Sequence, residues 1–481
     1  MDEAAERVRL VSDDLDAIDL GDSRLNYRMR RVAKRVAADP SKSFPEVLAT
    51  EAELEGFYRF FGNDKVTKEK LLEPHTSATV QRLTDRGTVL VVHDNTEFRF
   101  KGEGREGLGR VTRGGNGFFS HICLAVGADE TRDPLGVLDI DVWTRSGESP
   151  TQLRKRDPKA YAALRWAGVA TEQDRWFQMV ERAEACAGAA ASLVHLMDSE
   201  ADDYGLLWNL INARRRFVLR LCYDRKLDAE ATGSNTGEKA LEFVSKAETL
   251  ATRDVVLARR TRAKAGTGAN RTQPRKERLS RIAFSARRVV LVRPHHAPRT
   301  APKKLEVNIV AARETNAPEG ETPVEWLLLT TEPIDSKAAL LAVVDMYRGR
   351  WLIEEYFKAL KTGCAFETRQ LETANTIFKA LALFAPVAWA LLRMRTLSRL
   401  PGNFPIAMAL SPTQIKILKT ETGLPLRLNS SVLEGCLAVA RLGGHIKNNG
   451  APGWQVLGRG YTKLLTIEVG YKIAKRETSD R

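Results

Sequence analysis

The feature that most constrains the fold is the order of strand-like and helix-like segments between residues 87 and 222. The short β-branched run GTVLVVHDNTEF comes first, and GFFSHICLAVGADETRDPLGVLDIDVW follows as two further strands around a turn. A helical stretch near 171–188, the apolar run ASLVHLMDSEADD, a helix over 203–214 and the strand RFVLRLC complete the series. The segment therefore predicts one α/β sheet covered by helices.

Three antiparallel strands followed by helix, strand, helix and strand is the order of an RNase H-like α/β core. Two of these strands are predicted to end in an acid, Asp94 and Asp198. Functional side chains converge at strand ends in open α/β sheets, so we expect the two aspartates to lie close together. Glu97 is an alternative to Asp94, and Glu200 and Asp202 are alternatives to Asp198. Each acid taken alone also fits a turn-capping role.

The stretch YRGRWLIEEYFKALKTG supplies a third candidate acid, Glu354. On an ideal helix of about 100° per residue, Tyr347, Arg350, Glu354, Lys358 and Lys361 fall on one side and border an apolar face. An ordinary amphipathic helix with a Glu354–Lys358 pair would also explain this pattern. One acid among four donor or cationic groups instead suggests a metal ligand surrounded by phosphate contacts.

Three carboxylates brought together repel one another unless cations neutralise them, and oxygen ligands suit Mg²⁺ or Mn²⁺. Two such ions about 4 Å apart activate a nucleophile and stabilise a leaving oxygen in phosphodiester chemistry. The histidines show no metal-ligand spacing, and the widely spaced cysteines form no CxxC pair, which predicts reduced thiols and no zinc site. The five cysteines are Cys123, Cys186, Cys222, Cys364 and Cys436. Any metal is therefore expected on carboxylates.

The composition favours a nucleic-acid partner. The 481 residues carry a net charge of +14, with 43% hydrophobic and 28% charged residues, which predicts roughly three domains and excludes global disorder. Such a basic chain favours a polyanion over an anionic membrane. The longest apolar run, Ala380 to Leu392, is shorter than the roughly 20 residues that a bilayer requires and predicts a buried helix. The start of the chain has no apolar signal segment, so we expect a cytoplasmic protein.

Residues 1–70 are predicted to be helical, with Asp22 or Ser23 capping a helix that Pro40 ends. Four of its residues share one face of that helix: Arg24, Arg28, Arg31 and Arg35. A solvated basic face is one interpretation. Arginines in line without an interleaved acid repel one another, however, so a DNA backbone lying across them is the other.

Residues 71–400 are predicted to form the α/β domain, interrupted over about 223–335 by an inserted β subdomain. Within the insertion, residues 258–281 carry nine Lys or Arg against one acid and predict a mobile basic loop. Residues 401–481 are predicted to form a helical C-terminal domain.

Several segments of the chain resemble those of a known protein family. YRGRWLIEEYFKALKTG is similar to the Tyr-(2)-Arg-(3)-Glu-(6)-Lys signature of the insertion-sequence-four transposases, on Tyr347, Arg350, Glu354 and Lys361. LGDSRLNYR, FYRFFGNDKV, MDSEAD, GETPVEWLLLT, RWLIEEYFKALKTG and ARLGG follow the order seen in bacterial cut-and-paste transposases of the transposon-five type. Ser199 stands where that family often has an arginine, and the region after residue 400 diverges except for ARLGG and Trp454.

The resemblance implies a DDE triad of Asp94, Asp198 and Glu354 that holds two Mg²⁺ or Mn²⁺ ions. It implies nicking of transposon ends, hairpin formation and resolution, and strand transfer into target DNA. The partners would be double-stranded DNA and a second copy of the chain, joined through the C-terminal domain. No membrane and no small-molecule cofactor are expected.

The resemblance also implies DNA contacts. Tyr347, Arg350 and Lys361 would hold the end near the scissile phosphate. Trp326 would stack a flipped base, although a tryptophan packed in its strand is the alternative. Further contacts would come from Arg220, Trp351 and Lys358. The rival functions are a structure-selective nuclease of the same fold and a catalytically inactive DNA-binding derivative or inhibitor of transposition.

Overall fold

The computed structural model describes most of the chain, and the statements below concern those residues. They are 17–29, 50–102, 104–112, 114–145, 155–160, 172–232, 238–260, 274–295, 297, 299–446 and 450–479.

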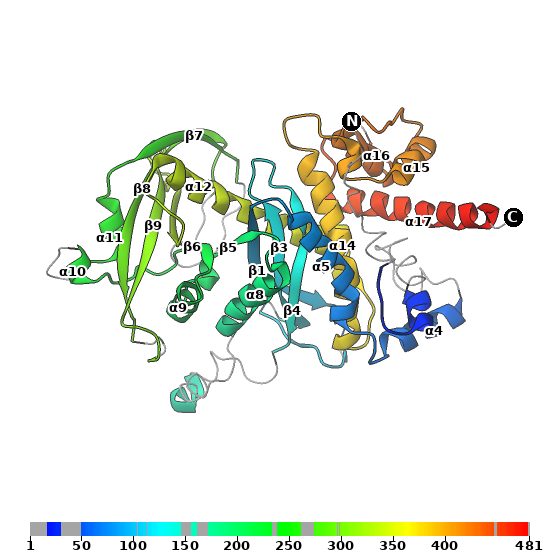
Figure 1. The fold of residues 1–481 in the computed structure, drawn as a ribbon, viewed down its shortest axis with the longest axis horizontal. Helices are drawn as coiled ribbons and strands as arrows, with labels where there is room; N and C mark the ends of the chain where they lie inside the picture. The colour runs from blue at the N-terminus through cyan, green and yellow to red at the C-terminus, as the bar shows by residue number, and fades with distance from the viewer. Residues whose placement is uncertain are drawn as a thin grey trace.

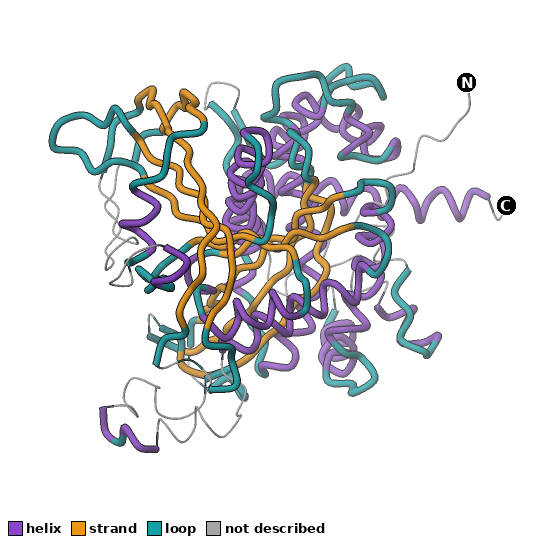
Figure 2. The backbone as a smooth tube through the Cα atoms, turned by 60° about the vertical axis from the view of Figure 1, so that its left-hand side comes forward, coloured by secondary structure: helices purple, strands orange, loops and turns teal. Residues whose placement is uncertain are grey.

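A single ten-stranded sheet runs through the protein (Figures 1 and 2). Its strands are β1 (Thr88–Phe100), β2 (Gly109–Arg110), β3 (Asn116–Gly127), β4 (Pro134–Trp143), β5 (Ser192–Met197), β6 (Arg216–Arg220), β7 (Ala251–Leu257), β8 (Arg278–Val292), β9 (Lys304–Glu314) and β10 (Glu325–Thr330). Their spatial order is β2-β3-β1-β5-β6-β10-β9-β8-β7, with β4 paired to the other edge of β3. The sheet is mostly antiparallel; β1, β5 and β6 pair in parallel.

Along the chain, β1, β3, β4, α8, β5, α9 and β6 follow one another in the predicted order. In the sheet they lie in the order β4-β3-β1-β5-β6, and this arrangement is consistent with an RNase H-like core. One expectation was wrong: β1 does not end at Asp94 but continues to Phe100, because residues 95–100 keep pairing with β3. The parallel pairing of β1 with β5 stops earlier, at Val92 and Leu196. Asp94 therefore lies just beyond the part of β1 that pairs with β5. It follows the end of the parallel pairing, although it does not follow the end of the strand.

The segment predicted to be a β insertion contains β7, β8, β9 and β10, which extend the core sheet; its status as a separate subdomain stays a prediction. Residues Leu328–Thr330 of β10 pair antiparallel with β6, and β9, β8 and β7 follow outward. Figure 1 shows β7, β8 and β9 at one end of the molecule and the C-terminal helices at the other. Most of the predicted basic loop, residues 261–273, lies outside the described residues.

Helices cover both faces of the sheet. They include α5 (Lys68–Leu83), α8 (Glu172–Ala187), α9 (Tyr204–Asn212), α12 (Lys337–Arg348), α13 (Leu352–Lys358) and α14 (Ala374–Leu397). Val89 and Val91 of β1 share a buried cluster with α8. Leu90 and Val92 share another with α12, α13 and α14. Because strand side chains alternate between faces, odd-numbered residues of this part of β1 point towards α8 and even-numbered ones towards α13.

The stretch from Tyr347 to Gly363 is not the regular helix that the sequence predicted. After α12 the chain forms a 3₁₀ turn, η3 (Gly349–Trp351), then α13, and then a π-helical turn, η4 (Ala359–Gly363). Each change of helix type alters the rotation per residue, so a wheel of about 100° per residue misplaces the side chains beyond it. π-helical turns occur frequently at functional sites.

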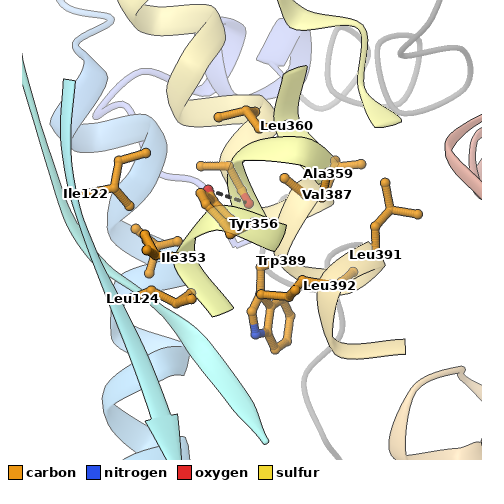
Figure 3. Close-up of a cluster of buried hydrophobic side chains, with 14 of the residues drawn as sticks. Ile122, Leu124, Ile353, Tyr356, Ala359, Leu360, Val387, Trp389, Leu391 and Leu392 are labelled. Atoms are coloured by element: carbon orange, nitrogen blue, oxygen red, sulfur yellow. Dashed lines mark hydrogen bonds between the residues drawn. The ribbon is translucent and has the colours of Figure 1, made fainter. Parts of the chain in front are cut away.

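Buried packing fixes α13 between the sheet and α14 (Figure 3). Ile353 and Tyr356 are fully buried and lie between Ile122 and Leu124 of β3 and Trp389 of α14. The hydroxyl of Tyr356 donates a hydrogen bond of 3.2 Å to the carbonyl of Ala385, which satisfies its buried polar group. The next residue after Ile353, Glu354, is thereby held at a defined place above the sheet.

The helix α14 is the predicted buried helix, although it is longer than the apolar run alone suggested. It is the one helix among the described residues with the length and composition to cross a membrane, and 94% of its most apolar window is buried inside the protein. Lys379 of α14 is itself buried and donates to the carbonyls of Phe61 and Asn63. Phe61 is the last residue of α4 (Glu51–Phe61), so this lysine caps the C-terminal end of α4 and joins that helix to the core.

The N- and C-terminal regions are helical where they are described. Residues 23–29 form a helix that Asp22 caps, as predicted, by accepting from the backbone N–H of Arg24 at 2.9 Å. Pro40 lies outside the described residues. At the other end are α15 (Pro412–Thr422), α16 (Val432–Leu442) and α17 (Trp454–Ser479). The domain boundaries stay predictions.

Close glycine contacts join α17 to its neighbours. A Cβ on Gly443, in the ARLGG block, would lie 2.1 Å from the carbonyl of Val456, so only glycine fits there. A Cβ on Gly458 would lie 2.0 Å from the carbonyl of Gly363 in η4. The C-terminal helix therefore packs directly on the π-helical turn that follows Glu354.

Candidate active site

The sheet register brings Asp94 and Asp198 side by side. Val92 of β1 pairs with Leu196 of β5, and each aspartate comes two residues later on its own chain segment. Asp198 directly follows β5 and caps the 3₁₀ helix η1 (Ser199–Ala201), with its Oδ1 accepting from the N–H of Glu200 at 2.8 Å. The equal offset brings the two aspartates close together, and the charge of Asp198 acts on Asp94.

Arg350 links the sheet to Glu354. Its Nη1 donates to Oδ2 of Asp94 at 3.3 Å, and its Nη2 donates to Oε1 of Glu354 at 2.7 Å. The side chains of Arg350 and Asp94 are 14% and 13% exposed, and that of Glu354 is 33% exposed. One guanidinium from η3 therefore joins a carboxylate of β1 to a carboxylate of α13 at a partly solvated site.

The electrostatics of Asp94 show that the acids act on one another. Burial raises the pKa of Asp94 well above its usual value, and the charge of Asp198 raises it further. Glu200 and Glu354 also raise this pKa, while Arg350 lowers it. Arg220 and Lys361 also lie at this site, so four carboxylates face three cations, and the carboxylates are in excess by one. The donor set contains only oxygen, so it fits a hard divalent cation such as Mg²⁺ or Mn²⁺.

Tyr347 is buried beside this group. Burial raises its pKa to about 12, so the phenol is neutral at physiological pH and able to donate a hydrogen bond. Arg350 and Arg220 lower this pKa and Asp198 raises it, which places the hydroxyl among the charged groups of the site. Arg220, the last residue of β6, is thus brought to the site as expected.

Trp326 of β10 is partly buried and contacts Tyr347 edge to face, with ring centroids 5.5 Å apart. Its ring is thus used in packing. The stacking of a flipped base on it stays a prediction.

Lys361 reaches β1 next to Asp94 because the π-helical turn η4 carries it there. Its Nζ donates to Oγ1 of Thr96 at 2.8 Å and to the carbonyl of Glu97 at 2.7 Å. Thr96 and Asp94 point to the same face of the strand, so this ammonium lies beside the carboxylates.

Lys358 lies elsewhere on the surface. It pairs with Glu355 at 2.5 Å, not with Glu354 as an i,i+4 helix would have it, because Arg350 occupies Glu354. Its Nζ lies 5.8 Å from the ring of Trp351, whose side chain is among the exposed large hydrophobic residues at 57%. These two residues form an exposed cation and aromatic pair at the edge of the site.

Comparison with known protein families decides which class of protein this site belongs to. Residues 9–66 match the family described as Transposase DNA-binding, and residues 193–388 match the family described as Transposase DDE domain. The chain carries a transposase DNA-binding domain and a DDE transposase domain. These matches support a DNA transposase, an enzyme that cleaves and joins DNA strands.

The DDE match contains Asp198 and Glu354, whereas Asp94 precedes it. Asp94 is assigned to the same site by geometry alone, through its ion pair with Arg350 and its strand register with Asp198. The basic residues of the N-terminal helix lie within the DNA-binding match. Arg24 and Arg28 are exposed there, whereas Arg31 and Arg35 lie outside the described residues.

The structure separates the alternative acids. Asp202 is buried, pairs with Arg225 and accepts from the backbone N–H groups of Cys222 and Tyr223, so it has a structural role. Glu97 accepts from the N–H of Thr112 at 3.0 Å and points to the opposite face of β1 from Asp94. Glu200 is exposed and acts on Asp94 electrostatically, so it stays an alternative ligand.

One cluster was missed by the sequence reasoning. His93, His121 and Cys123 are all buried and offer nitrogen and sulfur atoms that lie within 4.8 Å of one another. The expectation that histidines and cysteines form no metal-binding arrangement rested on spacing along the chain. Strand pairing between β1 and β3 brings these residues together in space instead.

Proposed function

We propose that this protein is a cut-and-paste transposase of the transposon-five type, within the insertion-sequence-four group. It would bind transposon ends, nick them, form and resolve hairpins, and join the ends to target DNA. The observation that carries the proposal is the convergence of three acids: Asp94 and Glu354 both pair with Arg350, and the charge of Asp198 acts on Asp94. Clustered carboxylates at a partly solvated site are the arrangement with which two-metal sites hold their ions in phosphodiester chemistry.

Asp94, Asp198 and Glu354 would hold the divalent cations. Bound there, two Mg²⁺ or Mn²⁺ ions would supply an activated nucleophile and stabilise the leaving oxygen. The residues around the acids would bind DNA instead of metal. Arg350 offsets the repulsion between Asp94 and Glu354, and its remaining donors suit a phosphate oxygen.

The other donors would hold the DNA end. Lys361 presents a positive charge beside the acids, and Tyr347 presents a neutral hydroxyl whose proton is retained throughout the physiological pH range. Both suit a phosphodiester backbone that must stay in line during strand cleavage. The partly buried Trp326 and the exposed Trp351 are the candidates for stacking a base expelled from the hairpin bend.

The flanking domains would assemble the complex in the cytoplasm. Arg24 and Arg28 would contact the phosphates of the transposon end. The helices α15–α17 would join two protomers so that one binds an end that the other cuts. The contact of α17 with η4 would transmit that assembly to the helix that carries Glu354.

A strand-cleavage assay tests the function with a matched pair of variants. The full-length protein is incubated with DNA carrying the ends of its own element and with Mg²⁺ or Mn²⁺, and the products are separated on a denaturing gel. Glu354→Gln should abolish nicks and hairpins, while Glu355→Gln, on the same turn of α13 but paired with Lys358, should retain both. A gel-shift assay should show end binding by both variants.

Two results would count against the proposal. Equal cleavage by wild type and Glu354→Gln would remove Glu354 from the chemistry. Tight end binding without cleavage by the wild type under either metal would favour the rival function, an inactive DNA-binding derivative or inhibitor.

A further inference from the structure

A second cluster of ligating side chains lies behind the acids, on the α8 face of the sheet. His93 Nδ1 lies 3.1 Å from His121 Nε2 and 3.3 Å from the sulfur of Cys123. The three residues come from β1 and β3, and each has no exposed surface. The proposed transposase chemistry makes no use of them.

A hydrogen-bond chain fixes the orientation of the His93 lone pair. The carboxylate of Glu184, on α8, can only accept, so His195 Nε2, at 3.1 Å, must carry a proton. The Nδ1 atom of neutral His195 is then an acceptor, and His93 Nε2, at 2.8 Å, must donate to it. His93 Nδ1 is therefore unprotonated, and its lone pair points at His121 and Cys123.

This arrangement has the form of a metal-ligand set with its supporting shell. Metal-binding imidazoles commonly donate their second N–H to a carboxylate or another acceptor, and His93 does so through His195, whose own N–H is donated to Glu184. Among the described residues, Nδ1 of His121 has no such acceptor. In tetrahedral zinc sites with bonds of about 2.0–2.3 Å, neighbouring donor atoms lie somewhat more than 3 Å apart. The observed separations of 3.1 and 3.3 Å are slightly shorter than that spacing, and all three ligand atoms lie within 4.8 Å of one another, so a bound ion requires only a small outward shift of the side chains.

A divalent ion would keep one uncompensated positive charge. Two neutral imidazoles and one thiolate leave that single charge, and the carboxylate of Glu184, one imidazole away, is shared with Arg215 at 3.5 Å. Trp176 of α8 packs edge to face on His121, with ring centroids 4.6 Å apart, which holds that imidazole in place. A set of nitrogen and thiolate ligands selects a softer ion than the oxygen ligands of the acids do.

We propose that His93, His121 and Cys123 supply three of the four ligands of a site for Zn²⁺, separate from the carboxylate site, with a water molecule as the fourth ligand. Binding replaces the thiol proton of Cys123 with a metal–sulfur bond and releases that proton to solvent. The ion joins β1 to β3 directly behind Asp94. Because the site is fully enclosed, the ion enters as the sheet forms and is retained by the folded protein.

Metal analysis of the purified full-length protein tests the site. Protein expressed with added zinc is dialysed against EDTA, which also removes weakly held Mg²⁺ or Mn²⁺, and its zinc is measured by mass spectrometry. The wild type should retain about one zinc per chain. Cys123→Ala and His121→Ala should lose it, while Cys436→Ala, which removes an equally buried thiol in α16, should keep it.

Cobalt provides a readout on the wild type alone, should the variants fail to fold. Wild type refolded with Co²⁺ should show a thiolate-to-cobalt charge-transfer band in the near ultraviolet and the visible bands of a tetrahedral site. The proposal is overturned if the folded wild type retains no zinc and shows no such band. It is also overturned if a folded Cys123→Ala variant retains zinc at the wild-type level. Strand cleavage is not measured, so either result leaves the proposed function standing.

Discussion

His93 and Asp94 are neighbours on one strand, yet they belong to two sites of opposite character. Asp94 points to the α13 face, where it pairs with Arg350 and lies close to the carboxylates of Asp198, Glu200 and Glu354. His93 points to the α8 face and joins buried imidazoles and a thiol. Burial keeps these groups neutral: it lowers the pKa of His121 to about 3 and raises the pKa of the Cys123 thiol well above its usual value.

The difference shows how the two faces of one sheet can serve different ends, the proposed chemistry on one face and the stability of the fold on the other. On the acidic face the charges are not balanced, so the folded protein holds a carboxylate, Asp94, in a position unfavourable for its charged form. On the histidine face each ring of the chain from Glu184 to His93 has a partner, so that network stabilises the fold. Substitutions on the two faces are therefore expected to affect different properties, cleavage on one and stability on the other.

The largest expected effect comes from removing an acid. Asp198→Asn should lower the rate of strand cleavage by about a thousandfold or more, because a lost metal ligand is worth several kcal/mol in the transition state. The matched substitution on the other face, His195→Gln on the same strand, should change this rate much less. Initial cleavage rates on saturating DNA measure both. Comparable losses in the two variants would break the distinction between the faces.

Breaking the histidine chain should have the next largest effect, on stability. His195→Leu keeps the volume but removes the hydrogen bonds of His195 to Glu184 and to His93 Nε2, which leaves the buried His93 N–H unpaired, at a cost of about 1–3 kcal/mol in the free energy of unfolding. Denaturant unfolding of the metal-free protein measures this change. Asp198→Asn is the comparison and should be no less stable than the wild type. If Asp198→Asn lost stability and His195→Leu did not, the stabilising role would belong to the acidic face and not to the histidine face.

Asp94→Asn should stabilise the metal-free protein. The pKa of Asp94 is higher in the folded than in the unfolded chain, so the wild type loses stability as pH rises from the unfolded pKa through the folded pKa, and the loss persists at neutral pH. The variant lacks this loss. Its Tm at neutral pH should exceed that of the wild type, with about 2–4 °C expected for each kcal/mol.

Two controls sharpen the prediction for Asp94. Asp139→Asn removes an acid that is paired with Arg182 on the other face and should lower the Tm. The advantage of Asp94→Asn should shrink when Mg²⁺ is added and when the pH approaches the unfolded pKa of an aspartate. A Tm of Asp94→Asn below that of the wild type at neutral pH without metal would contradict the excess negative charge inferred for the acidic face.

The smallest effect tests the proton positions of the histidine chain. Glu184→Gln offers a carbonyl oxygen that can still accept from His195 Nε2, so it should cost less than about 1 kcal/mol in unfolding free energy. Glu184→Ala removes the acceptor and should cost more. Denaturant unfolding compares the two variants. Equal costs would show that hydrogen bonding to His195 is not what Glu184 contributes.

The sequence predicted the acidic face better than any other part because its signals are local. Apolar runs that lead into an acid marked Asp94 and Asp198, and the spacing from Tyr347 to Lys361 marked the helix of Glu354. The continuation of β1 past Asp94 was missed because it depends on pairing with β3. The 3₁₀ and π-helical turns around α13 were missed because tertiary packing, not helix periodicity, sets the position of Lys361.

The histidine face could not be predicted from spacing. His93 and Cys123 are far apart in the sequence, and only the antiparallel register of β1 and β3 makes them direct partners. The extension of the sheet by β7–β10 likewise depends on one pairing, between β10 and β6, that no local pattern encodes. Long-range strand pairing thus explains most of what the sequence left open.

The most direct test of the central claim, that Asp94 holds a catalytic metal ion, is the metal dependence of Asp94→Cys in strand cleavage. A thiolate ligand tolerates Mn²⁺ better than the harder Mg²⁺. The account predicts that the variant is inactive with Mg²⁺ and regains at least about tenfold in rate with Mn²⁺. Glu97→Cys, on the same strand but the other face, should cleave with both metals. Cleavage by Asp94→Cys with Mg²⁺ at the wild-type rate would contradict the account.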